Sequence, residues 1–200
     1  ARKDVFPIPA TVDSTLHLTW YQASGTNVSL TLRYGNQFEE TVRAIDSLKY
    51  LLVPTTKLPH IPPGDLFTHF KVYRIVNPTV VPGSHVLDDQ FDAEPETVSV
   101  LRPVYFITPC IKNGVQWRDS ITHYVAYSFV PKTKYVGPSR NTQDQFGPHT
   151  LFPDSSRFVL VPTKKGAINP RDVPGLGTYG LGVLTLLLAV TAVCVLTRKR

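Results

Sequence analysis

The sequence predicts a mainly β domain of the β-sandwich class, followed by one transmembrane α-helix near the C-terminus. Proline is frequent, with 18 among 200 residues, and its ring removes a backbone donor and clashes with the preceding helical turn. Short segments alternate apolar and polar residues between turn residues, which indicates strands. Residues 176–197 carry no charge. Apolar residues make up 42% of the chain, which is enough for the part outside residues 176–197 to form a packed core.

The first third of the chain contains several predicted strands. Leu16, Leu18 and Trp20 alternate with polar neighbours, and residues 28–34 repeat this alternation before the turn dipeptide Gly35-Asn36. Further strands are expected at 40–45, 48–53 and 67–76. Turn signals recur about every 8–12 residues, a spacing typical of β-sandwiches.

The second half is less regular. Residues 77–96 are rich in turn residues and acids, so we expect a long loop there or a seam near 77–97 between two β modules. A strand at 98–111 contains Pro103 and Pro109 and is expected to lie at a sheet edge or to bend. Asn113-Gly114 predicts a hairpin. Residues 121–129 carry aromatic residues on both faces, which predicts a central strand. Residues 131–153 are expected to be loop and 158–161 a last strand, so the predicted domain spans 1–161.

The stretch at 176–197 is long enough to cross a bilayer. Its 22 residues rise about 1.5 Å each as a helix, which matches a hydrocarbon layer of roughly 30 Å. The residues expected to contact lipid are Leu181, Leu184, Leu187, Leu188 and Val195. Residues 162–175 form the predicted linker. A basic tail follows, made of Arg198, Lys199 and Arg200.

Orientation in the membrane is predicted from three signals. The basic tail favours a cytoplasmic C-terminus, although Lys164, Lys165 and Arg171 nearly balance it on the other flank. The chain begins at Ala1 without an initiator methionine, for which removal of a signal peptide is the simplest explanation, and Asn27 begins a glycosylation sequon. We therefore expect a type I membrane glycoprotein with a lumenal or extracellular domain. The alternative is a tail-anchored protein that faces the cytosol.

The sequence carries no recognisable reaction centre. It has no nucleophile elbow and no glycine-rich phosphate loop, and its 6 histidines are scattered singly rather than at zinc-binding spacings. Cys110 lies in the soluble part and Cys194 within the predicted membrane helix, so we expect no disulfide between them. The formal charge of +6 includes three charges from the tail. The charge that remains on the soluble part is too small to indicate nucleic-acid binding. We predict a protein that is not an enzyme, uses no cofactor or metal and binds no nucleic acid.

Exposed aromatic residues are the best sequence candidates for a binding site. Tyr135, Phe146 and Phe152 lie in the proline-rich region 131–153, where a sandwich core does not need them. Aromatic side chains are enriched at protein interfaces. These residues predict contacts with protein partners, as an accessory subunit of a membrane complex or as a cell- or virion-surface protein.

The N-terminal part resembles a known family. A strand that ends in Trp20, a VSLTL-type strand over 28–35 and the loop 57–65 that leads to a strand are similar to features of the Ig-like N-terminal domain of fungal Ser/Thr-rich cell-wall proteins, which is shared with β-1,6-glucan assembly proteins. The resemblance covers residues 14–76. It implies an Ig-like module at a cell surface, with carbohydrate binding or cell-wall assembly as an alternative function. No Ser/Thr-rich stalk follows, and no catalytic residue transfers.

Overall fold

The computed structural model describes residues 17–57, 68–87, 94–114, 120–130 and 137–166, and the regular elements in these ranges are all strands. This confirms the prediction of a mainly β domain. In chain order the strands are β1 (His17–Gln22), β2 (Leu30–Gly35), β3 (Glu40–Lys57), β4 (His69–Ile75), β5 (Val81–Leu87), β6 (Glu96–Cys110), β7 (His123–Ser128), β8 (Arg140–Asp144), β9 (Gly147–Leu151) and β10 (Phe158–Gly166).

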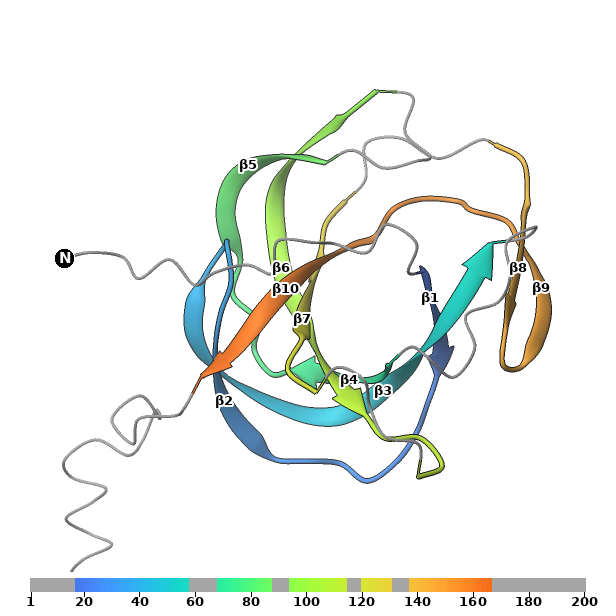
Figure 1. The fold of residues 1–200 in the computed structure, drawn as a ribbon. Helices are drawn as coiled ribbons and strands as arrows, with labels where there is room; N and C mark the ends of the chain where they lie inside the picture. Colours follow the sequence, from blue (N-terminus) through green and yellow to red (C-terminus); the bar gives the residue numbers. More distant parts are fainter. Residues whose placement is uncertain (1–16, 58–67, 88–93, 115–119, 131–136, 167–200) are drawn as a thin grey trace, which may run out of the picture.

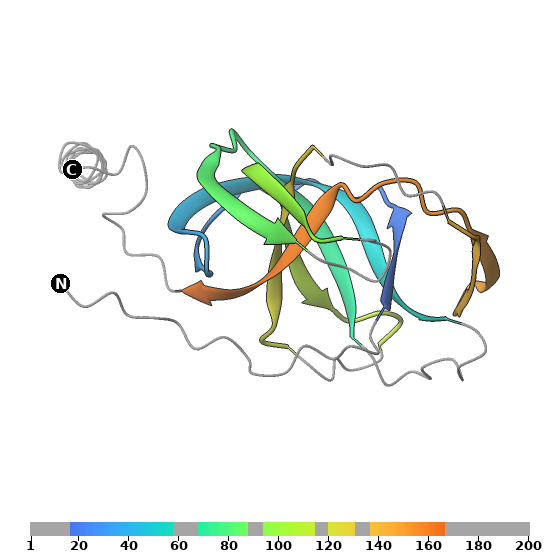
Figure 2. The same cartoon turned by 90° about the horizontal axis from the view of Figure 1, so that it is seen from above.

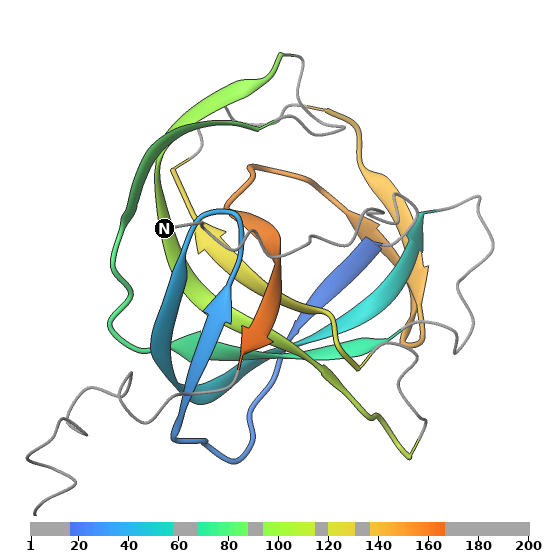
Figure 3. The same ribbon diagram turned by 60° about the vertical axis from the view of Figure 1, so that its left-hand side comes forward.

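Six of these strands form a closed ring. The order β2-β10-β7-β6-β4-β3 is hydrogen-bonded throughout, and β2 also pairs with β3, so the sheet returns to its starting point. Every pairing in the ring is antiparallel. Figure 3 shows β2 lying between β3 and β10 where the ring closes. The two layers that a sandwich would hold apart are therefore joined into one sheet.

Strand β3 is the longest and connects the ring to β1 and to the hairpin β8–β9 (Figure 1). Its first part pairs with β2, its later residues 50–55 pair with β1, and its end pairs with β8. Register shifts near Leu48 bend β3 between these partners, as bulges do. The separate strands predicted at 40–45 and 48–53 are thus two halves of one bent strand.

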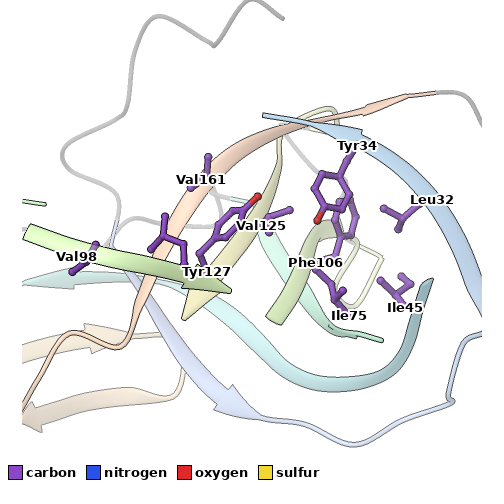
Figure 4. Close-up of a cluster of buried hydrophobic side chains, with 10 residues drawn as sticks. Leu32, Tyr34, Ile45, Ile75, Val98, Phe106, Val125, Tyr127 and Val161 are labelled. Carbon is purple, nitrogen blue, oxygen red and sulfur yellow. The ribbon is translucent and has the colours of Figure 1, made fainter. Parts of the chain in front are cut away.

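The interior of the ring holds the larger hydrophobic core (Figure 4). All six ring strands contribute to it, because alternate residues of each strand point inward. Its fully buried members include Tyr34 and Tyr127. The complete set of buried residues is Leu32, Tyr34, Ile45, Ile75, Val98, Leu101, Phe106, Val125, Tyr127 and Val161.

The two core tyrosines end in a polar network. Both hydroxyls donate to Oε1 of Glu39, at 2.8 Å from Tyr34 and 3.0 Å from Tyr127. Oε2 of Glu39 accepts from Arg43 at 3.0 Å, and the amide of Asn36 donates to the Tyr127 hydroxyl at 3.0 Å. Burial raises the pKa of both tyrosines far above the ordinary value, and the Glu39 charge raises it further. The network therefore satisfies the polar ends of two large core residues.

A second core lies on the other face of the sheet. Leu52, Phe70, Val72, Ile107 and Ala126 form it, with β1 residues packed against them. Strand β7 faces both cores, since Val125 and Tyr127 point into the ring and Ala126 points away. The central position predicted for this strand is confirmed, because β7 pairs with β6 and β10.

Several boundary predictions were wrong. The expected loop at 131–153 contains the hairpin β8–β9, and the expected seam near 77–97 contains β5, which pairs with the first part of β6. Strands β4 and β6 pair across that seam, so the chain does not divide into two modules there. Strand β6 is not an edge strand, although its register shifts beside Pro103 as a bend requires.

The boundary with the linker also differs. Strand β10 continues through Pro162 to Gly166, because its last residues pair with β2. Within the described ranges no helix is long and apolar enough to span a membrane. The predicted anchor residues Leu181, Leu184, Leu187, Leu188 and Val195, the basic tail and Tyr135 all lie outside the described residues.

Candidate functional site

The hairpin β8–β9 presents the candidate residue Phe146 at its tip. Asp144 pairs with Gly147, which leaves Gln145 and Phe146 as a two-residue turn. The Asp144 carboxylate accepts a hydrogen bond from the Phe146 backbone N–H at 2.8 Å, a side-chain contact that stabilises turns. Gly147 has a φ of 119°, which favours glycine. The short segment Asp-Gln-Phe-Gly therefore builds its own turn.

The hairpin is attached to the rest of the domain through one strand. Strand β8 pairs with the end of β3, at Thr56 with Gln143 and at Lys57 with Thr142. Among the described strands, β9 pairs with β8 alone and is an edge. Pro148 lies on this edge and offers no N–H to an incoming strand. Addition of a further strand at Pro148 is therefore disfavoured.

A cluster of three polar side chains fixes the hairpin against β1. The Tyr21 hydroxyl donates to Oδ2 of Asp144 at 2.6 Å, and Nε2 of His149 lies 3.0 Å from that hydroxyl and 3.2 Å from Oδ1 of Asp144. Because Tyr21 donates to the carboxylate, its oxygen is free to accept, and a proton on His149 Nε2 satisfies both neighbours. The Asp144 side chain is fully buried, whereas that of His149 is 31% exposed.

The electrostatics of this cluster agree with its geometry. Burial opposes ionisation of Asp144, yet hydrogen bonds from Tyr21, the Phe146 backbone and His149 hold the pKa of its carboxyl below the ordinary value. Burial, together with the hydrogen bond to Asp144 and its charge, raises the pKa of Tyr21 to about 12. At neutral pH the buried carboxylate is therefore ionised and bound by three donors, which makes the cluster a rigid support.

Phe146 is held in place but remains open to solvent. Its ring is 55% exposed as a residue and packs edge-on against Tyr21, with ring centroids 4.8 Å apart. Nζ of Lys112 lies 5.6 Å from its centroid and also bonds the side chain of Gln145. An exposed aromatic ring whose position is set before binding loses little entropy when a partner covers it. Such a ring can serve as an anchor for a protein contact.

The structure separates the other candidates from Phe146. Phe152 is 79% exposed and follows the end of β9, whereas Phe146 precedes its start, so the two are separated by roughly 20 Å of extended chain. They do not form one patch. Asn27 lies exposed in the connection between β1 and β2. Sequence reasoning missed Tyr21, Asp144 and His149; the turn pattern Asp-x-x-Gly was a usable signal for Asp144, but nothing local marked Tyr21.

Neither comparison with known proteins nor the other reactive side chains identify a further functional site. Comparison of this chain with protein-family models, with curated proteins and with solved structures finds no match in any of the three. Among the described residues, no group of three or more His, Cys, Asp or Glu side chains is arranged to hold a metal ion. Cys110 is a free thiol, and burial raises its pKa. The hairpin is the feature from which a function is best argued.

Proposed function

We propose that this chain is a single-pass type I membrane glycoprotein whose β domain binds a partner protein without catalysing a reaction. One observation carries the proposal: Phe146 is exposed at the tip of a hairpin that three buried or half-buried polar side chains hold rigid. The buried Asp144 carboxylate fixes the position of the exposed Phe146 ring, and a fixed exposed ring is suited to binding a partner. The partner is a subunit of the same membrane complex or a component of the same cell or virion surface.

The non-catalytic part of the proposal rests on how the polar cluster is satisfied. Tyr21, Asp144 and His149 resemble the parts of an acid–base site, but the Asp144 side chain is fully buried and its oxygens accept from Tyr21, the Phe146 backbone and His149. A catalytic base must reach the proton it removes. A carboxylate enclosed by its own donors instead favours a structural role.

The membrane part rests on the uncharged stretch 176–197 and on the sequon. Strand β10 leads toward that stretch and ends on the side of the domain opposite the hairpin (Figure 2). An anchor beyond β10 would leave the hairpin at the far end of the domain, where it is accessible to a neighbour held in the same membrane. The exposure of Asn27 is compatible with a glycan.

The experiment is purification of the full chain from membranes in mild detergent, with Phe146→Ala and Val86→Ala as paired variants. Val86 is 69% exposed on β5 and serves as the control for loss of an exposed apolar side chain. A stoichiometric partner that is lost with Phe146→Ala and kept with Val86→Ala supports the proposal. A wild-type chain that purifies alone, or a partner retained by both variants, contradicts it.

Orientation has its own test. Glycosidase treatment of the wild-type chain and of Asn27→Gln distinguishes the two arrangements, since only a lumenal or extracellular Asn27 receives a glycan. A mass decrease in the wild type that is absent from the variant supports the type I orientation. No decrease in either favours the tail-anchored alternative. The carbohydrate-binding alternative, with the Ig-like module that the fungal resemblance implies, predicts retention of the chain on immobilised β-glucan.

A further inference from the structure

A cluster of aromatic side chains lies on the same face of the sheet as the second core, and Trp20, Tyr50 and Tyr105 pack against that core. Trp20 and Phe158 stack, with ring centroids 5.6 Å apart and planes 13° apart, although they come from β1 and β10. Tyr105 contacts both at 6.1 and 5.7 Å, and Tyr50 contacts Trp20 at 5.3 Å. Phe158 is 38% exposed and the other three rings are half-buried. The curvature of the sheet therefore brings together side chains from β1 and β10, which do not pair with each other.

Two arginines border these rings on the same face. Residues that pair across antiparallel strands point to the same side of a sheet. Arg102 pairs with Ser128, which pairs with Phe158, and Arg74 pairs with Tyr105. We call this surface the aromatic face. It consists of Trp20, Tyr50, Arg74, Arg102, Tyr105 and Phe158.

The charge of the aromatic face is unbalanced. Arg74 donates to both carboxylate oxygens of Asp46, through Nε at 3.0 Å and through NH2. Arg102 is exposed, and within the described ranges no carboxylate pairs with it. Among the described residues, the two arginines of this face are therefore paired with one carboxylate only, that of Asp46.

The composition of this face matches that of protein interfaces. Trp, Tyr and Arg dominate the residues whose removal costs the most binding energy, whereas Lys and Glu are depleted there. The aromatic face contains neither Lys nor Glu. Half-buried rings with fixed neighbours lose little freedom on binding, and a guanidinium at the border binds a carboxylate in bidentate geometry.

We propose that the aromatic face is a second docking surface, which binds a segment of a partner protein that presents carboxylates beside apolar side chains. Charge complementarity favours this occupant, because a segment that covers Arg102 displaces its water, and a carboxylate replaces that water whereas a basic side chain is repelled. The inference does not depend on the hairpin, since Phe146 belongs to a different surface. A neutral glycan is the competing occupant and is an outcome of the test.

The test uses the full chain in detergent with Trp117→Phe, so that Trp20 is the single tryptophan and reports on the face. Three synthetic peptides of equal length and equal Leu and Ile content, differing only in Glu, Lys or Ser at the polar positions, and a neutral β-glucan oligosaccharide are titrated. Arg102→Glu is the variant. Lys71→Glu is the matched control, since Lys71 is exposed on β4 but points to the opposite side of the sheet from Arg74.

We expect the acidic peptide to change Trp20 emission saturably and to weaken about tenfold with Arg102→Glu, but less than about twofold with Lys71→Glu and with Phe146→Ala. Phe158→Ala should also weaken it, without reversing the preference for acid. Equal binding of the three peptides, equal loss with both charge reversals, or no response to any probe would overturn the proposal. Saturable binding of the glucan alone, unchanged by Arg102→Glu, would overturn it in favour of a glycan surface.

Discussion

Replacement of Tyr21 by Phe tests whether the hairpin is held by the polar cluster. The substitution deletes one hydroxyl and leaves the ring that packs 4.8 Å from Phe146. The lost hydrogen bond is 2.6 Å long and ends on a carboxylate whose side chain is fully buried. A hydrogen bond to a charged group contributes about 1.5–3 kcal/mol. The Phe146 backbone and His149 still bind Asp144, so we expect a loss near the lower limit, about 1.5–2 kcal/mol.

The assay is urea denaturation of the full chain, combined with amide exchange at Phe146. Tyr73→Phe is the control, because it removes a hydroxyl from the inner face of β4 without altering the hairpin. We expect faster exchange of the Phe146 amide only in Tyr21→Phe, since local opening of the hairpin exposes it. A stability change below about 0.5 kcal/mol together with unchanged exchange would refute the view that Tyr21 holds the hairpin.

Three further perturbations probe the same account. The folded-state pKa of Asp144 lies below its unfolded value of about 3.9. Its stabilising contribution is therefore present above that pH and is lost as the pH falls through the folded pKa. The difference in unfolding free energy between wild type and Asp144→Asn should shrink in acid titrations below about pH 4. Glu39→Gln should destabilise the ring by about 2–3 kcal/mol in urea, since it removes the charge that Arg43 faces in a largely buried pair; an unchanged midpoint would contradict this. Gly147→Ala should cost about 1–2 kcal/mol from backbone conformation alone, because an added Cβ meets nothing within 4 Å, and thermal melts equal to wild type would show that the turn tolerates other residues.

Local patterning predicted the strands well where alternation was clear. The runs ending at Trp20 and Tyr34 and the segment 67–76 correspond to β1, β2 and β4. The hairpin β8–β9 escaped detection because its strands are short and polar, with Arg, Asn, Thr, Gln and Asp in β8. Such strands are stabilised by pairing with β3 and by contacts with Tyr21 rather than by their own apolar pattern.

The closure of the sheet could not be predicted from the sequence, because it also depends on contacts between distant strands. Alternation places residues on one face but does not say which strand lies beside which. The pairing of β2 with β10 joins residues far apart in the chain, and Tyr34 and Tyr127 meet on Glu39 only in the folded ring. Phe146 was identifiable as an aromatic residue in a turn-rich segment, but the cluster that supports it is assembled from β1, β8 and β9.

Site-specific photocrosslinking measures the central claim most directly. A benzoylphenylalanine introduced at position 146 of the full chain, in intact membranes, should form one discrete crosslinked product with a membrane protein. The same group at Val86, which is also exposed, should not form that product. The same pattern of products from both positions, or none from position 146, would contradict the assignment of the hairpin tip as a docking surface.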